Sequence, residues 1–186
     1  MNKQFEIKIR RGLMEMLEEC SLDEVNVKNL SEKTGLSKQA FYYHASNVTE
    51  YLCKRIARLA KKYADECGDN VNMIPEAARK AMEQFREVRP VCEGMMSSEH
   101  KLEYLSALDE SVHKEMRKLV TRHMAKFRME FDETKIKRIS NHFADAVYGL
   151  LKADLLNNMQ EDPAEICRDY KQIVGRAISI VVENYF

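Results

Sequence analysis

The chain has 186 residues, of which 45% are hydrophobic and 32% charged, and it contains only six Gly and three Pro. Together with dense helical periodicity, this composition predicts an all-α protein with one core or two small ones. No apolar run approaches the roughly 18–20 residues that cross a bilayer, and no apolar segment follows Met1 as in a signal peptide. We therefore expect a cytoplasmic protein that does not span a membrane.

The formal net charge is zero, but the charges are distributed unevenly. Residues 1–62 hold 12 Lys/Arg and 8 Asp/Glu, whereas the remainder holds 18 and 22. This asymmetry agrees with nucleic-acid binding at the N-terminal end. Residues 1–50 alone, however, hold seven basic and eight acidic residues. Charge therefore lends little support to DNA binding, and the case depends on motifs.

The first predicted element is a helix with one apolar face. Its hydrophobic residues recur at spacings of three and four; they are Phe5, Ile9, Leu13, Met16, Leu17 and Cys20. Residues 21–25 then form a short connector.

Two short helices joined by a tight turn are predicted next. Asn26 is suited to cap the first of them, and Thr34-Gly35 ends it because glycine adopts the left-handed conformation at little steric cost. Ser37 caps the second, which runs over residues 38–44. Two helices joined by a short turn containing Gly are typical of a helix-turn-helix. The alternative is a capped helical hairpin in a protein that does not contact DNA.

A longer helix follows this pair. Residues 47–50, Asn-Val-Thr-Glu, have the form of a capping box, and the helix that they open has an apolar face at Leu52, Ile56, Leu59 and Tyr63. We therefore predict a three-helix DNA-binding head over residues 1–50 and a helical domain over residues 51–186.

The N-terminal segment resembles the TetR family of bacterial transcriptional regulators over about the first 55 residues. The matching residues are Gly12, Leu17, Val27, Leu30, the run TGLSK at residues 34–38 and the run FYYH at residues 41–44. The resemblance implies a DNA-binding transcriptional regulator that acts as a homodimer on a palindromic operator. It also implies a small-molecule effector bound among the central helices, with repression as the usual mode.

Three positions depart from the family pattern. Ala45, Asn47 and Val48 stand where family members usually have an aromatic residue and then Ser-Lys. The absent lysine removes a usual phosphate contact, so affinity would depend more on backbone N–H groups and other side chains. The FYYH ending without Ser-Lys is similar to a branch often associated with dihydroxyacetone-kinase operons.

The predicted DNA contacts lie in and around the second helix of the motif. Lys38, Gln39 and Tyr43 are expected nearest the major groove, and Gln39 is suited to a bidentate contact with adenine. We expect the phosphate contacts, which fix register without reading sequence, from Asn26, Ser37, Tyr42 and His44; Lys28 is a further predicted DNA-binding residue. Phe41 is expected in the core.

From residue 51 onward six helices are predicted, over residues 51–67 (the longer helix described above), 75–88, 99–107, 110–130, 134–158 and 163–185. Pro75 is compatible with a helix start, Pro90 and Gly94 indicate a loop, and Asp162-Pro163 is a typical helix opening. The last two helices are rich in apolar residues, and the family resemblance implies that they pair between protomers in a four-helix bundle. The alternative is that they close a monomer core. The predicted dimer interface consists of Phe143, Val147, Leu150, Val174, Ile178 and Val181.

The effector pocket is predicted from the family resemblance and from the flexible Met side chains, of which the chain has eleven. Its predicted lining is Met95, Met96, Tyr104, Met116, Met124, Phe127, His142 and Tyr148. The alternative is that these are ordinary core residues.

Other functional classes find little support. No paired metal-ligand motif and no catalytic or nucleotide-binding motif is present, so neither an enzyme nor a cofactor or metal site is expected. The five Cys are expected to be reduced core residues, with a redox sensor as the alternative. A second alternative function is a helical co-regulator that acts through a protein partner, which the near-neutral first 50 residues and Val48 would favour.

Overall fold

The computed structural model describes residues 3–126 and 132–172, and these form helices joined by turns, with no strand among them. The all-α prediction is therefore confirmed. Within the described residues, no helix is long and apolar enough to cross a membrane. Four residues with predicted roles, Phe127, Val174, Ile178 and Val181, lie outside the described residues.

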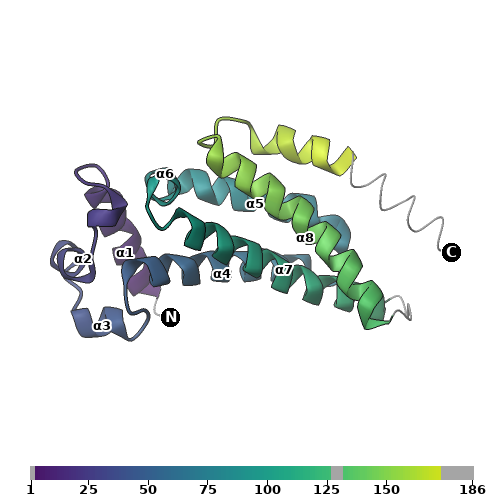
Figure 1. The fold of residues 1–186 in the computed structure, drawn as a ribbon, viewed down its shortest axis with the longest axis horizontal. Helices are drawn as coiled ribbons and strands as arrows, with labels where there is room; N and C mark the ends of the chain where they lie inside the picture. The colour runs from purple at the N-terminus through teal and green to yellow at the C-terminus, as the bar shows by residue number, and fades with distance from the viewer. Residues whose placement is uncertain (1–2, 127–131, 173–186) are drawn as a thin grey trace.

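A compact group of three helices occupies one end of the elongated molecule (Figure 1). They are α1 (Lys3–Met16), α2 (Val27–Thr34) and α3 (Lys38–Tyr42), with the 3-10 turn η1 (Leu22–Glu24) between α1 and α2. Their shared core is almost fully buried and includes Phe5, Ile9, Leu13, Leu30 and Phe41. Phe41 thus lies in the core, as predicted.

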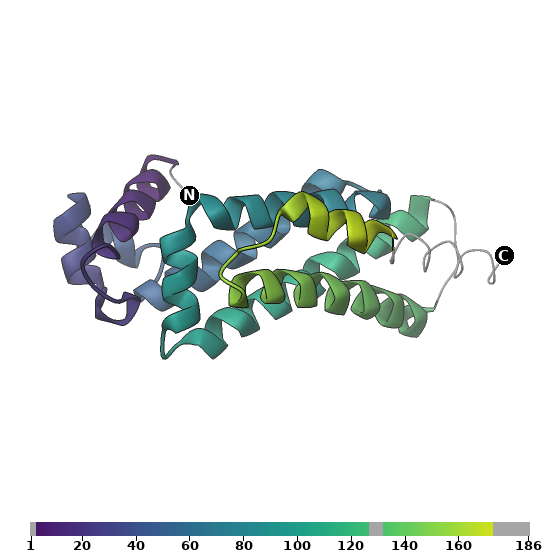
Figure 2. The ribbon, with the colours of Figure 1, turned by 90° about the horizontal axis from the view of Figure 1, so that it is seen from above.

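The body consists of the helices that follow, seen from a second side in Figure 2. They are α4 (Val48–Cys67), α5 (Ile74–Glu87), α6 (Arg89–Ser97), α7 (Lys101–Lys126) and α8 (Glu133–Leu156), with η2 (Val71–Met73) before α5. α7 packs against both α4 and α8, and α5 contacts α4 and α8. Because α4 begins beside α3 and runs the length of the body, it connects the two ends of the molecule (Figure 1).

Two predictions about the body were wrong. The loop expected around Pro90 and Gly94 is the helix α6. Proline is tolerated in a first helical turn, where its missing N–H is not needed, and Gly94 allows α6 to pack closely on Leu17 and Leu22. The break expected between residues 107 and 110 is absent, because α7 continues through it.

The helices predicted over residues 51–67, 75–88 and 134–158 are α4, α5 and α8, which start one to three residues earlier than predicted and end within two residues of the predicted ends. Of the last predicted helix, residues 163–172 are helical and the rest lies outside the described residues.

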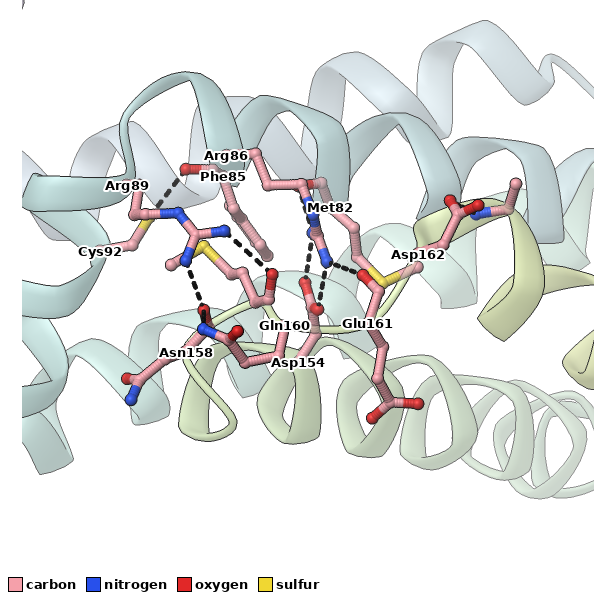
Figure 3. A network of polar contacts seen from close by, with 12 residues as sticks. Met82, Phe85, Arg86, Arg89, Cys92, Asp154, Asn158, Gln160, Glu161 and Asp162 are labelled. Atoms are coloured by element: carbon pink, nitrogen blue, oxygen red, sulfur yellow. Dashed lines mark hydrogen bonds and ion pairs between the residues drawn. The ribbon is translucent and has the colours of Figure 1, made fainter.

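Two arginines at the junction of α5 and α6 hold the turn that follows α8 (Figure 3). Arg86 donates two hydrogen bonds of 2.8 Å to the carboxylate of Asp154 and a third to the carbonyl of Glu161. Arg89 donates to the carbonyls of Asn158 and Met159, at 2.7 and 3.0 Å. We call Arg86, Arg89 and Asp154 the C-terminal clamp, because these contacts position the helix at residues 163–172.

Candidate DNA-binding surface and ligand cavity

Local hydrogen bonds define both helices of the helix-turn-helix. Asn26 caps α2 by accepting from the N–H groups of Lys28 and Asn29, and the Asn29 side chain returns a bond to the Asn26 N–H. Gly35 ends α2 with a φ of 67°, in the left-handed region. Ser37 caps α3 by accepting from the Ala40 N–H at 3.1 Å. The predicted caps are confirmed.

α3 presents a polar and aromatic surface to solvent. Lys38, Gln39 and Tyr42 are exposed, and Tyr43, directly after α3, is 86% exposed. Phe41 faces inward and is 1% exposed, so it fixes the rotation of the short helix about its axis. The residues expected nearest the groove are therefore accessible from solvent.

The other predicted DNA contacts occupy less uniform surroundings. The side-chain oxygens of Asn26 and Ser37 already accept capping hydrogen bonds, whereas Lys28 is exposed. His44 is half-buried, with its ring centroid 4.4 Å from that of Phe5. Burial lowers the pKa of His44, with nearby positive charges adding to the effect. Its ring is therefore packed in the head, and its carbonyl accepts a bond from Lys54.

The start of α4, where the TetR resemblance led us to expect a lysine and the chain has Val48, carries a carboxylate network. Asn47 caps the helix by accepting from the Glu50 N–H at 2.7 Å. In the expected capping box, Glu50 would return a bond to Asn47; instead it accepts from the N–H and hydroxyl of Ser46. Hydrogen bonds from Lys54 and Ser46 lower the pKa of Glu50 to about 2. The Ser46 N–H is thereby engaged, and the Glu50 carboxylate is paired with the Lys54 ammonium group at 2.7 Å beside the helix-turn-helix.

An apolar cavity lies in the body between α4, α5, α7 and α8. The space among its lining atoms is about 620 Å³, part of it open to solvent. The lining comprises Ile56, Leu59, Ala60, Tyr63, Ala64, Cys67, Ile74, Ala77, Ala78, Ala81, Phe85, Leu108, Val112, Glu115, Met116, Leu119, Val147 and Leu151.

Of the eight residues predicted for the effector pocket, Met116 lines this cavity. Met95, Tyr104 and Met124 are buried elsewhere, and the Tyr104 hydroxyl lies 3.4 Å from that of Thr49 on α4. Met96 and Tyr148 are half-buried, His142 is exposed, and Phe127 lies outside the described residues. The structure does not gather the eight residues at the cavity.

The small residues of the cavity wall were not among the predicted pocket residues. Ala60 and Ala64 on α4, and Ala77 and Ala81 on α5, are each spaced four apart and line the same space. Residues four apart share one helix face, so this spacing was a readable signal of an inward face with spare room.

The described residues of the predicted dimer interface lie on α8. Phe143 and Leu150 are half-buried, while Val147 is buried and belongs to the cavity wall. Phe143 and Leu150 therefore remain as the described residues of this set with accessible apolar surface.

A cluster of polar groups connects the head with the start of α7. Asp23, Glu99 and His100 each offer one atom that could ligate a metal ion, a carboxylate oxygen or a ring nitrogen, and these atoms lie within 4.8 Å of one another. Asp23 accepts hydrogen bonds from the Ser98 hydroxyl and the Glu99 N–H, and a hydrogen bond with Glu103 raises the pKa of His100. These contacts join η1 to the α6–α7 turn.

Comparison with known proteins supports the fold. No family model and no curated protein matches the sequence. Among solved structures, the fold is similar to that of "Dihydroxyacetone kinase operon activator DhaS", with a TM-score of 0.63. The similarity covers 94% of this chain and 96% of that chain, at 10% sequence identity. At this identity the comparison shows that the two chains share a fold.

Proposed function

We propose that this protein is a DNA-binding transcriptional regulator that reads a palindromic operator as a homodimer. The surface of α3 is the observation that carries the proposal. A capped helix-turn-helix presents exposed Lys38, Gln39 and Tyr43, while buried Phe41 anchors the helix from behind. Lysine and glutamine side chains supply the donors and acceptors that read base edges in the major groove.

Dimerisation follows from the small size of this surface. α3 has five residues, so one copy contacts few base pairs. A two-fold dimer would place two such helices about 34–36 Å apart, one turn of the duplex, and so read a palindrome. The half-buried apolar residues Phe143 and Leu150 on α8 support a protomer contact there.

Ligand response is the third part of the proposal. α4 lines the apolar cavity through residues such as Leu59 and Tyr63 and begins beside the helix-turn-helix. A ligand that shifts α4 would therefore move the head relative to its partner. The coupling required is about 1–3 kcal/mol, which is roughly 5- to 150-fold in DNA affinity.

The TetR resemblance favours repression, whereas the structural neighbour is titled an activator. Expression of a reporter gene fused to the operator, measured with and without the protein, distinguishes the two.

A second candidate function is a co-regulator that acts on a protein partner. The observation that favours it is the ion pair between Glu50 and Lys54 at the start of α4, because a lysine held by a carboxylate has less positive charge to offer a phosphate there. A steep salt dependence of binding would argue against this candidate as the whole function, because each neutralised phosphate contributes about 0.9 to the slope.

Fluorescence anisotropy with the DNA flanking its own gene, at 50 and 200 mM salt, tests the proposal. We expect salt-sensitive binding that resists competition by random DNA. Gln39→Ala should weaken specific binding by about 1–3 kcal/mol and leave binding to random DNA unchanged. Lys114→Ala, at an exposed position on α7, is the matched control. Binding no tighter than to random DNA would count against direct regulation through that operator.

A further inference from the structure

We infer that the cavity between α4, α5, α7 and α8 takes an apolar ligand with one cationic group, which pairs with Glu115. The inference deepens the ligand response proposed above, and its regulatory meaning rests on that proposal. The binding itself is a separate property of the body.

The walls of the cavity define the apolar part of the ligand. Aliphatic and aromatic side chains from all four helices line it, including Leu59, Phe85 and Leu119. Five alanines from α4 and α5 contribute the room, because a larger side chain at any of them would fill it. The apolar surface of a bound molecule would be removed from water here, which is the main source of affinity in such sites.

Glu115 supplies the charge. It is the charged side chain among the lining residues, and its residue is 6% exposed. Of the other polar lining groups, Tyr63 donates its hydroxyl proton to the Lys80 carbonyl at 3.0 Å, and burial raises the pKa of the Cys67 thiol. A buried carboxylate is costly unless it is paired, so the cavity favours a cation.

The present partner of Glu115 is replaceable. Lys118 lies one turn further along α7, with its Nζ atom 2.7 Å from the Glu115 carboxylate, and its side chain is 45% exposed. A long lysine side chain reaches solvent easily, so Lys118 can leave Glu115 at little cost to its own hydration while an incoming ammonium group keeps the buried carboxylate paired. An ammonium group within the cavity can therefore take the place of Lys118, whereas an anionic ligand would face Glu115.

The test uses three eight-carbon molecules that differ in head-group charge: octylamine, 1-octanol and octanoate. Each competes with the fluorescent apolar probe N-phenyl-1-naphthylamine for the full-length protein. A charge-assisted hydrogen bond in a shielded site should make octylamine bind about tenfold more tightly than 1-octanol. Octanoate should bind most weakly. Equal affinities, or tightest binding by octanoate, would overturn the inference.

Variants identify the groups involved. Glu115→Gln should reduce octylamine binding to the level of 1-octanol and leave 1-octanol unchanged, while Glu110→Gln, exposed on the same helix, should change neither. Lys118→Gln should strengthen octylamine binding, which keeps the inference testable if Glu115→Gln does not fold. If Glu115→Gln reduced the affinity for all three molecules equally, a charge-specific role of Glu115 would be contradicted.

Location and regulation are tested separately. Ala77→Phe, which fills the cavity, should abolish binding of all three molecules, whereas Ala57→Phe at an exposed position of α4 should not. Retained binding in Ala77→Phe would place the ligand elsewhere.

If octylamine binds but leaves operator affinity unchanged, the proposed ligand response fails while the site stands. If no probe binds, the site fails and DNA binding is unaffected.

Discussion

Gly12 determines how closely the first two helices of the head approach each other. A Cβ atom at this position would overlap Cγ2 of Thr34 and lie 3.3 Å from Cδ1 of Leu30. Thr34 cannot easily rotate away, because its hydroxyl donates a 2.7 Å hydrogen bond to the Leu30 carbonyl. Gly12, one of the residues on which the resemblance to TetR regulators depends, therefore has a steric role. It lets α1 and α2 pack with almost no space between them.

Gly12→Ala should destabilise the head by about 1–3 kcal/mol through this overlap, despite the better helix propensity of alanine. Urea denaturation followed by circular dichroism measures the change. Thr34→Ser removes Cγ2 and keeps the hydroxyl, so the double variant Gly12→Ala/Thr34→Ser should recover most of the loss. Equal stability of Gly12→Ala and the natural protein would show that α1 and α2 can move apart to admit the methyl group at no cost in free energy.

Two histidines should titrate on opposite sides of the ordinary value of 6.5. Burial lowers the pKa of His44, and the hydrogen bond with Glu103 raises the pKa of His100. An NMR titration of the ring protons should show these midpoints, and Glu103→Gln should move only that of His100 toward 6.5. A His44 midpoint at or above 6.5 would contradict its packing against Phe5.

These shifts act on stability with opposite signs. The contribution of His44 is fully present above 6.5 and is lost as the pH falls toward its lowered pKa in the folded state. The contribution of His100 is fully present below 6.5 and is lost as the pH rises through its raised pKa. A stability profile of the whole chain near neutral pH therefore contains two opposed terms.

At the scale of elements, the sequence predicted what short-range chemistry decides. Asn26, Gly35 and Ser37 act on groups within a few residues, so their capping roles could be recognised from the sequence. α6 was missed because Pro90 and Gly94 usually interrupt helices, whereas here Gly94 is accommodated by the distant residues Leu17 and Leu22. The partner of Glu50 was misassigned by one residue, because Ser46 offers both an N–H and a hydroxyl.

The ion pair of the C-terminal clamp joins α5 to α8, and one partner is almost fully buried. The Asp154 side chain is 1% exposed and that of Arg86 20%. Arg86→Met would leave the carboxylate buried without its cation, so unfolding in urea should show a loss of about 3–5 kcal/mol.

Arg117→Met is the matched control, because Arg117 forms an exposed 2.6 Å pair with Glu133 between α7 and α8. Its loss should be at most about 1 kcal/mol. The double variant Arg86→Met/Asp154→Leu should be more stable than Arg86→Met alone, since no charge remains unpaired. Equal losses in Arg86→Met and Arg117→Met would show that burial adds nothing to the pair.

At the scale of the whole molecule, the cavity is the feature that the sequence pattern predicted least well. Its wall takes residues from four helices separated by up to 95 positions, from Ile56 to Leu151. The high methionine content led us to predict a pocket lined by methionines. The cavity instead exists because small alanine side chains of α4 and α5 line it opposite α7 and α8. Which side chains meet there depends on how the helices cross, and hydrophobic periodicity does not determine that.

The proposed dimer also belongs to this scale. Sedimentation at micromolar concentration should show a species of twice the 21.7 kDa chain mass. Phe143→Glu should shift it toward the monomer, because a carboxylate would enter an apolar protomer contact, while Lys114→Glu on α7 should not. A 21.7 kDa species alone for the natural protein would refute the dimer. Circular dichroism would establish that Phe143→Glu remains folded.

The C-terminal clamp has a consequence for the order in which the chain folds. Its contacts join residues 68 to 75 positions apart, so a long loop must close before any of them forms, and loop closure carries an entropic cost. The pairs between neighbouring helices, such as α1 with α2, need no such closure. The turn after α8 should therefore dock late, after the folding transition state. Weakening the clamp would then accelerate unfolding far more than it slows folding, and the lifetime of the native protein, more than its rate of formation, would depend on two arginines.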